Sequence, residues 1–238
     1  FSFAVDEEFS NNVFHQIESS SSVVPPVCIE LAIEIDSFTR QTFASDQETT
    51  DWALAIIAGV SQIYDSETNT ALVVVYSYIW NTIDPYDAFV SQSSAMLSEL
   101  ASYWITNNGA VTRDLVHLMT KRSNTGTGGI AYLDVLCDNS WGYGFSSYLD
   151  NDTTYNFPNP SYTWNLACIA HEVGHNIGSR HTHWCGWAAD PWTIPPFPGG
   201  VIDNCVDIEI PSSGGVGSCI NNPTPQVGTI MSYCDIVL

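Results

Sequence analysis

The sequence predicts an α/β fold, a twisted mixed sheet of five strands with helices above it. Strand and helix patterns alternate along residues 28–121, and right-handed β-α-β crossovers of this kind give a mainly parallel sheet. Periodicity then breaks down over residues 182–229, which are rich in Gly, Pro, Asn and Cys. Because long irregular segments in compact proteins are usually functional or held by disulfides, we expect a lower, disulfide-pinned region there. The 238 residues, 45% of them apolar, suffice for one domain divided by a cleft.

The first elements follow from hydrophobic periodicity. Residues 28–36 alternate apolar and polar side chains, as a strand does, and residues 71–80 are β-branched and aromatic, as in a buried strand. Between them, residues 51–64 carry apolar side chains at helical spacing. Ser45 or Asp46 is in position to cap the start of this helix.

The remaining regular elements follow in the same way. A second amphipathic helix should cover residues 88–106 and end at the Asn-Asn-Gly that follows it. Strands are expected over residues 114–121, over residues 130–137 after a Gly-rich turn, and over residues 143–150. A third helix should cover residues 164–177, after which regular patterning ends.

The charge balance excludes some partners. Five Lys and Arg stand against 26 Asp and Glu, for a net charge of −21. With no basic patch to neutralise phosphates, nucleic acid is not an expected partner, and an anionic membrane surface is disfavoured for the same reason. A solvated, soluble surface explains the acidity, and adaptation to salt or to bound calcium remains open. The sequence has no run of eighteen apolar residues, so no membrane-spanning helix is expected.

The cysteines indicate an oxidising, extracellular location. Five of the seven follow position 160, in the irregular region, which is unusual for a cytosolic protein. The odd number leaves one thiol unpaired or paired outside the chain. The chain begins with acids where a signal peptide would carry bases, so we expect a mature or trimmed form of a secreted protein. Four late cysteines should form two disulfides, with three connectivities open: Cys185, Cys205, Cys219 and Cys234.

The strongest chemical signal is the segment HEVGHNIGSRH. His171 and His175 are four residues apart on the predicted helix, so both imidazoles project from one face and can bind one zinc ion. Glu172 lies between them in sequence, beside the metal but not on it, where it can take a proton from water and pass it to a leaving amine. This pattern is typical of a catalytic base next to a metal.

Gly178 and His181 complete the pattern. Gly permits the positive φ at which a helix stops sharply, which returns His181 to the metal as a third ligand. Three His leave one tetrahedral position open, as in catalytic rather than structural zinc sites. Chance would produce these spacings in roughly one of a hundred thousand such chains. A structural zinc site would explain neither Glu172 nor Gly178.

These residues resemble the metzincin metalloproteases, whose signature is H-E-x-x-H-x-x-G-x-x-H followed by a Met-containing turn. The turn is present here as GTIMSYC, with Met231 as its methionine. In that family the methionine packs beneath the ligands and binds no metal. The chain is most similar to the reprolysin (adamalysin-like) branch, which it resembles over residues 27–235 in four segments: CIELAIEID, RDLVHLMT, GGIAYLDVLC and CIAHEVGHNIG.

Some features differ from that branch. Thr182 stands where reprolysins usually have Asp, and Tyr233, two residues after Met231, is similar to the serralysin and astacin tyrosine that reaches the zinc. That resemblance implies a Tyr233 hydroxyl near the metal that stabilises the oxyanion, while a packed aromatic remains the alternative. The spacing of the late cysteines is similar to pappalysins, which favours the pairs 185–219 and 205–234. Only seven residues follow Met231, so the C-terminal helix of the branch is missing or short.

The resemblance also implies a domain layout and a calcium site. An arm over residues 1–26 should precede an upper subdomain over residues 27–178 with the zinc helix, and residues 179–238 should form the lower subdomain, with the zinc cleft between the two. Glu30 and Asp114 match two calcium ligands of the branch. Two oxygens are few for Ca²⁺, so two solvated acids at strand ends remain the alternative.

A substrate strand is expected ahead of the zinc helix. In metzincins this edge strand pairs with an extended peptide in antiparallel fashion, and main-chain pairing of this kind demands little of the peptide sequence. The segment in that position is Gly128, Gly129, Ile130, Ala131 and Tyr132. An ordinary edge strand is the alternative.

The function that follows is a secreted, monomeric zinc endopeptidase that cleaves extended proteins or peptides. Its rival is a binding or adhesion module on a catalytically inactive protease scaffold, for which loss of the base or of a ligand would be the signature. All four residues are present. His183 is expected on the surface or behind the ligands, and His117 in the core or the cleft wall.

Overall fold

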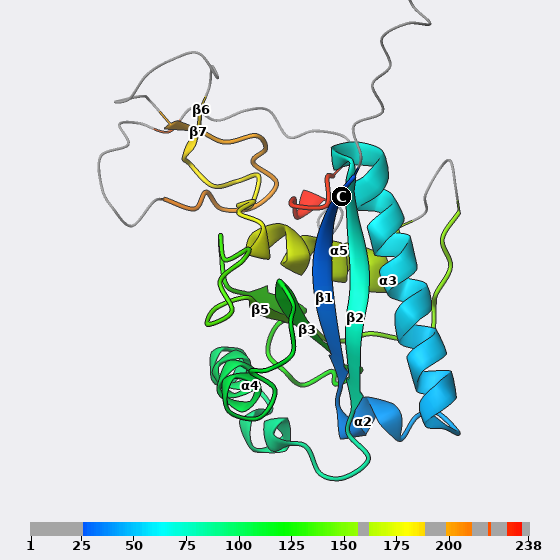
Figure 1. Ribbon diagram of the computed structural model, residues 1–238. Helices are drawn as coiled ribbons and strands as arrows, with labels where there is room; N and C mark the ends of the chain where they lie inside the picture. Colours follow the sequence, from blue (N-terminus) through cyan, green and yellow to red (C-terminus); the bar gives the residue numbers. More distant parts are fainter. Residues whose placement is uncertain (1–25, 157–161, 189–198, 211–218, 220–227, 235–238) are drawn as a thin grey trace, which may run out of the picture.

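A computed structural model describes residues 26–156, 162–188, 199–210, 219 and 228–234. Its main sheet has the order β2-β1-β3-β5-β4, in which β4 alone is antiparallel to its neighbour (Figure 1). The strands are β1 (Val27–Ile35), β2 (Thr70–Ile79), β3 (Leu115–Met119), β4 (Gly129–Ala131) and β5 (Tyr143–Ser146). The predicted mixed, mainly parallel five-stranded sheet is therefore confirmed, and β4 forms one of its edges.

Helices cover both faces of this sheet. The helices α3 and α5 pack against one face and α4 packs against the other. The helical elements are α2 (Ser37–Arg40), α3 (Asp46–Thr68), the 3-10 helix η1 (Pro85–Phe89), α4 (Ser93–Asn107) and α5 (Trp164–Asn176). A small two-stranded sheet, β6 (Trp187–Ala188) with β7 (Gly199–Gly200), lies beyond the end of α5 (Figure 1).

One helix start is confirmed and one differs from the expectation. Helix α3 begins at Asp46, where the Ser45 hydroxyl caps it as predicted by accepting a hydrogen bond from the Glu48 N–H. Helix α4 begins only at Ser93. The chain before it forms η1, whose Asp84 side chain accepts a hydrogen bond from the Tyr86 N–H.

The strand expected over residues 130–137 is wrong in length. β4 ends at Ala131, because Asp134 and Cys137 adopt positive φ angles of 57° and 66° and turn the chain out of the sheet. The turn has a partner: the Asp134 N–H donates to the His175 carbonyl and the Val135 N–H to the Asn176 carbonyl. Free carbonyls at the end of α5 are thereby satisfied, which fixes that end of the helix beside β4.

The alternation predicted for β1 separates two cores. Ile29, Leu31, Ile33 and Ile35 face α3 and α5, whereas Ala32 faces α4. Glu34 shares the α4 side and is completely buried.

The Glu34 carboxylate accepts hydrogen bonds from the indole N–H groups of Trp80 and Trp104 and from the Tyr86 hydroxyl. Burial nevertheless raises the pKa of Glu34 to about 7. A charged residue of the alternating strand is thus part of the interior.

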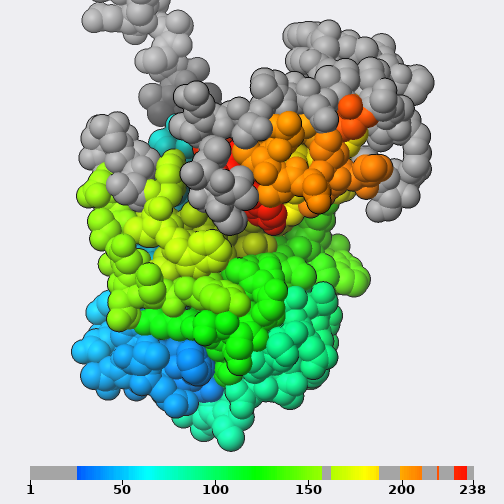
Figure 2. Space-filling model, turned by 180° about the vertical axis from the view of Figure 1, so that it is seen from behind, coloured from blue at the N-terminus to red at the C-terminus, as the bar shows by residue number. Residues whose placement is uncertain are grey.

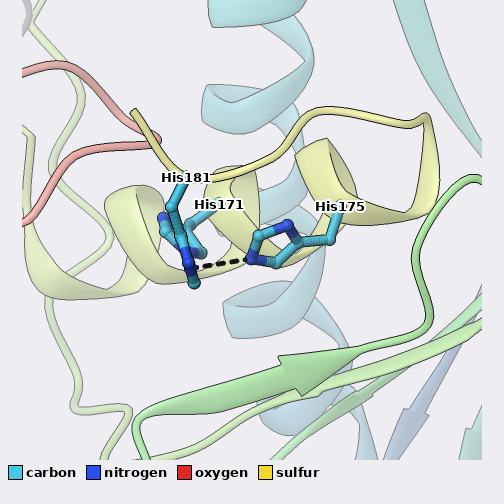
Figure 3. A group of neighbouring side chains, drawn as sticks. All are labelled: His171, His175 and His181. Carbon is cyan, nitrogen blue, oxygen red and sulfur yellow. Dashed lines mark hydrogen bonds between the residues drawn. The ribbon is translucent and has the colours of Figure 1, made fainter. Parts of the chain in front are cut away.

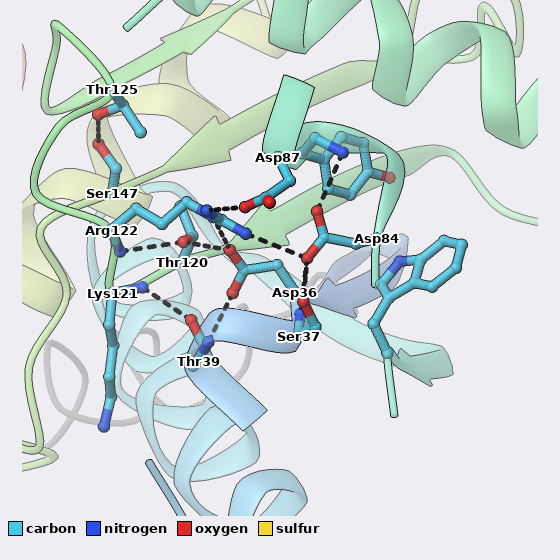
Figure 4. Close-up of polar contacts among 12 residues, drawn as sticks. Asp36, Ser37, Thr39, Asp84, Asp87, Thr120, Lys121, Arg122, Thr125 and Ser147 are labelled. Atoms are coloured by element: carbon cyan, nitrogen blue, oxygen red, sulfur yellow. Dashed lines mark hydrogen bonds and ion pairs between the residues drawn. The ribbon is translucent and has the colours of Figure 1, made fainter. Parts of the chain in front are cut away.

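A buried ion-pair network holds the chain that leads to β4. The Arg122 guanidinium, between β3 and β4, contacts the carboxylates of Asp36, Asp84 and Asp87 (Figure 4). The Asp36 carboxylate also accepts hydrogen bonds from Thr39 and Thr120. All these groups gather where β1 and β3 end.

The segment between Arg122 and β4 is anchored further along. The Tyr148 N–H donates to the Arg122 carbonyl, and the Ser147 hydroxyl donates to the Thr127 carbonyl. These bonds tie the approach to β4 to the segment that follows β5.

Two disulfides hold the segments after α5. They join Cys185 to Cys219 and Cys205 to Cys234, so the expected pairing is confirmed. Three cysteines remain free rather than one: Cys28, Cys137 and Cys168. Figure 2 shows the red residues near the C-terminus between the orange residues 199–210 and the yellow-green region of α5. Among the described residues, no helix is long and apolar enough to cross a membrane. The arm expected over residues 1–26 lies almost wholly outside the described residues.

Candidate metal centre and catalytic cleft

Helix α5 carries the first two candidate ligands. Its N-cap is Thr163, whose side chain accepts a hydrogen bond from the Leu166 N–H. His171 and His175 lie one turn apart on the face toward the cleft, with ring centroids 4.7 Å apart. The helix predicted over residues 164–177 is thus the element that positions both imidazoles.

The turn after the helix returns the third imidazole. Gly178 has a φ of 104°, a conformation that favours glycine, and the Ser179 N–H bonds back to the Gly174 carbonyl. The chain then reverses, and His181 lies beside His171 and His175 (Figure 3). Gly178 thus has the positive φ that was predicted for a sharp helix end.

The three imidazoles point the same nitrogen at one place. His181 Nε2 lies 3.1 Å from His175 Nε2 and 3.2 Å from His171 Nε2. Each opposite nitrogen has an acceptor: His171 Nδ1 the Ile230 carbonyl at 2.7 Å, His175 Nδ1 the Ser179 carbonyl at 2.8 Å, and His181 Nδ1 the Glu209 carboxylate at 2.7 Å.

These contacts fit a bound cation. A neutral imidazole that donates its Nδ1 proton has only a lone pair at Nε2, so three such nitrogens cannot hydrogen-bond to one another. A tetrahedral zinc ion with Zn–N bonds of about 2.0–2.1 Å holds its nitrogens roughly 3.3 Å apart, close to the observed spacing. Burial lowers the pKa of His171 to about 4 and also lowers that of His175, which keeps both neutral. The donor set suits zinc.

Glu172 is placed as a base and not as a ligand. Its side chain is 5% exposed, and its Oε2 atom has no hydrogen-bond partner among the described residues. Burial raises the pKa of Glu172 to about 8. The carboxylate lies against Gly129 of β4, where a Cβ would come within 2.6 Å of Glu172 Cγ.

Two hollows meet at this glutamate. One, of about 290 Å³, contains all three imidazoles and is bounded by Ile130, Arg180 and Glu209. The other, of about 240 Å³, lies between Gly128 of the β4 approach, Trp164 of α5 and Ser232. Residues lining both are Gly129, His171, Glu172 and Tyr233. The cleft therefore extends to either side of the candidate base.

Tyr233 lies at the imidazole cluster. Its hydroxyl is 3.1 Å from His181 Nε2, and its ring stacks on that of His171 with centroids 5.7 Å apart. Burial raises the pKa of Tyr233 to about 12, so the phenol keeps its proton at neutral pH. The serralysin- and astacin-like pattern implied a position of this kind, and the hydroxyl lies beside the candidate ligands.

Met231 packs against the zinc helix. Its sulfur lies beside Gly174, and its carbonyl accepts hydrogen bonds from the N–H and hydroxyl of Thr182. The neighbouring Ile230 carbonyl holds His171. Thr182, which stands where the reprolysin branch usually has Asp, is thus joined to the Met-containing turn.

The predicted substrate segment lies at the cleft, with one exception. Gly129, Ile130 and Ala131 line the larger hollow and belong to the edge strand β4, while Gly128 lines the smaller one. Tyr132 bonds through its N–H to the Tyr143 carbonyl, and its ring meets Trp141 edge-on. Neither hollow includes Tyr132 in its lining.

The structure gives the calcium prediction no support. Asp114 uses its carboxylate to accept a hydrogen bond from the Glu30 N–H at 2.7 Å. Within the described residues, no group of three or more potential metal-ligating side chains includes Glu30 or Asp114. The Asp114 carboxylate thus ties the start of β3 to the main chain of β1, and we do not propose a calcium site.

Sequence reasoning missed Glu209, whereas His183 takes one of the two positions expected for it. Glu209 Oε1 lies 2.7 Å from His181 Nδ1 and 3.3 Å from His183 Nε2. His183 is 2% exposed and lies behind the candidate ligands, whereas His117 is fully buried in the core. Glu209 lies in an aperiodic segment 28 residues beyond His181, and no spacing in the sequence links the two.

Fold and site together define a mixed α/β protein with a three-histidine metal centre and a buried glutamate in a cleft. The chain belongs to metallo-peptidase family M12, since a reprolysin model of that family matches residues 27–226. The expected resemblance to the reprolysin branch of the metzincins is confirmed. The match ends at residue 226, before the Met-containing turn and nine residues short of the expected 235.

Similar proteins are distant. The chain is 25% identical over 155 residues to disintegrin and metalloproteinase domain-containing protein 1 of Rattus norvegicus. The aligned region covers 64% of this chain and 18% of the relative. The chain is 23% identical over 157 residues to protein 1a of Mus musculus, covering 65% and 18%. The chain thus spans less than a fifth of these relatives.

A solved structure described as a chaperone-substrate complex matches at 14% identity with a TM-score of 0.49, over 67% of this chain and 25% of that one. That likeness is too loose to carry an argument.

Proposed function

We propose that this protein is a zinc-dependent endopeptidase that hydrolyses peptide bonds of extended protein substrates. The observation that carries the proposal is the convergence of three imidazoles beside the buried Glu172 carboxylate, with His181 Nε2 3.1 Å from His175 Nε2 and 3.2 Å from His171 Nε2. His171, His175 and His181 would hold the zinc. Family membership supports the same chemistry.

The residues of the chain would divide the reaction as follows. When bound, zinc supplies a positive charge that polarises the scissile carbonyl and makes water more acidic. Glu172 accepts the proton of the attacking water, and its unpartnered Oε2 and raised pKa suit a group that must carry the proton briefly. Glu172 then donates this proton to the leaving amine.

Tyr233 is the proposed oxyanion donor. Its hydroxyl keeps its proton at neutral pH and lies within 3.1 Å of a candidate ligand nitrogen. A small rotation would aim it at an oxygen in the cleft, where a preset donor stabilises the developing charge.

The substrate would add to β4. This strand is the sheet edge, and its residues line the cleft beside Glu172. An extended peptide could pair with the main-chain groups of Gly129 and Ala131 without demanding a sequence, and would replace the Thr127 hydroxyl that now donates to the Gly129 carbonyl. Side chains on either side of the scissile bond would then enter the two hollows.

Within this proposal, residues 27–178 form the upper subdomain and residues 179–238 the lower one, with the cleft between them and an arm over residues 1–26. The two disulfides support a secreted, extracellular protein. The −21 net charge favours a monomer that binds neither nucleic acid nor anionic membranes.

A digest with a matched variant tests the function. The zinc-loaded protein should cleave casein, a chelator should stop cleavage, and added zinc should restore it. Glu172→Gln should bind zinc but lose cleavage by at least about 10³-fold, since proton transfer contributes about 10²–10⁴-fold. Glu99→Gln, on α4 across the sheet, is the control and should cleave normally.

Two results would overturn the proposal. Glu172→Gln activity within tenfold of the parent would remove Glu172 as the base. A zinc-loaded parent that binds casein or gelatin without cutting it would assign the chain to the binding modules on an inactive protease scaffold.

A further inference from the structure

We propose that Glu209 is a positioning residue that holds and polarises His181, the third candidate zinc ligand. The inference rests on the proposed zinc site and assigns a role to a residue outside the H-E-x-x-H-x-x-G-x-x-H signature. Glu209 acts on the metal through its contact with His181.

The acceptor on His181 differs from those on the other two imidazoles. His171 and His175 each donate an Nδ1 proton to a neutral main-chain carbonyl, whereas His181 donates to a carboxylate at 2.7 Å. A hydrogen bond to a charged acceptor is roughly twice as strong as one to a neutral acceptor. It fixes the ring orientation and makes Nε2 a better electron donor to a metal.

His181 needs this second anchor more than its partners. His171 and His175 belong to α5, whose main-chain bonds fix their backbone. His181 lies in a loop beyond Gly178, where no helix restrains it. The contact with Glu209 supplies at the side chain the restraint that the helix gives the other two.

Glu209 is itself held from two sides. Its main chain pairs with the segment after His181: the Cys185 N–H donates to the Glu209 carbonyl at 2.8 Å, and the Glu209 N–H donates to the His183 carbonyl at 3.1 Å. The carboxylate also contacts His183 Nε2, and the His183 ring stacks on that of His181 with centroids 4.8 Å apart. The main-chain pairing of these two segments therefore places the Glu209 carboxylate against the His181 ring.

Two substitutions separate the carboxylate from its backbone. Glu209→Gln keeps the length and an acceptor oxygen but removes the charge, and Glu209→Ala removes both. Neither change deletes the main-chain bonds to Cys185 and His183. Asp207→Asn is the matched control, because Asp207 is an exposed carboxylate two residues earlier in the same segment.

The measurements are zinc affinity, by competition with a chromophoric chelator at fixed pH and salt, and the visible spectrum of the cobalt-loaded protein. We expect zinc to bind about tenfold more weakly in Glu209→Gln and about 10- to 100-fold more weakly in Glu209→Ala. Asp207→Asn should match the parent. The cobalt bands should shift in both Glu209 variants, while the metal-free melting temperature of Glu209→Gln stays that of the parent.

Zinc affinities of both variants within twofold of the parent would overturn the proposal. So would a fall in metal-free stability of Glu209→Gln that accounts for the whole affinity loss. A second zinc equivalent in the parent, lost in the variants, would instead make His183 and Glu209 ligands of another metal. Because no readout requires cleavage, a protein that binds zinc in this pattern but cuts nothing would refute the endopeptidase and leave Glu209 in its role.

Discussion

The sulfur of Met231 lies where a side chain on Gly174 would begin. A Cβ on Gly174 would come within 2.6 Å of Met231 Sδ and within 3.4 Å of the Tyr64 hydroxyl. Gly in the middle of a helix costs about 1 kcal/mol relative to Ala. Helix α5 has a glycine at position 174 despite that cost, because the Met-containing turn approaches the helix backbone closely there.

Gly174→Ala should therefore destabilise the protein, although alanine favours helices. Overpacking typically costs about 1–3 kcal/mol, and here it displaces the turn whose Ile230 carbonyl holds His171, so zinc should also bind more weakly. Urea unfolding and zinc titration measure both effects. In a Met231→Ala background the sign should reverse, and Gly174→Ala should stabilise by up to about 1 kcal/mol. Equal effects in both backgrounds would contradict the contact.

Gly129→Ala should impair catalysis without removing zinc. A Cβ at Gly129 would overlap the Glu172 side chain, which would have to leave its place in the cleft. We expect turnover of a peptide substrate to fall at least about tenfold, since general bases act within hydrogen-bonding reach. Glu99→Gln, on α4 across the sheet, is again the control. Full activity of Gly129→Ala would show that Glu172 is free to work from another position.

Tyr233→Phe separates the two roles open to this phenol. If the hydroxyl acts on the oxyanion, turnover should fall by about 10²–10³ with little change in the Michaelis constant, because the hydrogen bond forms only in the transition state. Tyr132→Phe, at the far end of β4, should have no such effect. Unchanged turnover with a lower melting temperature would make Tyr233 a packed aromatic and nothing more.

The ionisation of Glu34 should make the stability of the folded protein depend on pH, and a Glu34→Gln variant isolates this contribution. Burial raises the pKa of Glu34 from 4.5 to about 7, so the unfolded chain loses this proton at lower pH than the folded chain. The contribution to stability is complete below pH 4.5 and is lost as pH rises through 7, a change of about 3 kcal/mol. Glu34→Gln cannot titrate.

Urea unfolding of both forms at pH 5, 6, 7 and 8 tests this. The stability of the parent relative to Glu34→Gln should fall steadily over that range, while ionisations elsewhere cancel in the difference. A difference independent of pH would show that the indole and phenol donors hold Glu34 ionised throughout.

Local spacing predicted much of the fold and most of the candidate site. The four-residue interval between His171 and His175 places both side chains on one helix face, and the glycine at 178 marks the end of that helix. Both signals are local in the sequence. Cysteine spacing, read by resemblance, gave both disulfides. Periodicity also placed β1, β2 and α5 within a few residues of their observed bounds.

The remaining features depend on contacts between distant segments. Residues 130–137 look like a strand, but Asp134 and Val135 satisfy the end of α5, which the local pattern does not contain. Glu34 alternates like a surface residue, yet three donors enclose it: Trp80 just after β2, Tyr86 in η1 and Trp104 in α4. Glu209 reaches His181 only through the pairing of two irregular segments.

The disulfide Cys205–Cys234 makes the arrangement of the late segments depend on oxidation. It closes three residues beyond Met231, while its companion begins four residues beyond His181. Cys185 and Cys234 are buried, whereas Cys205 and Cys219 are only half-buried. A chain under reducing conditions lacks both covalent ties between the segments that follow the third histidine. The arrangement of those segments around His181 and Met231 therefore depends on an oxidising environment.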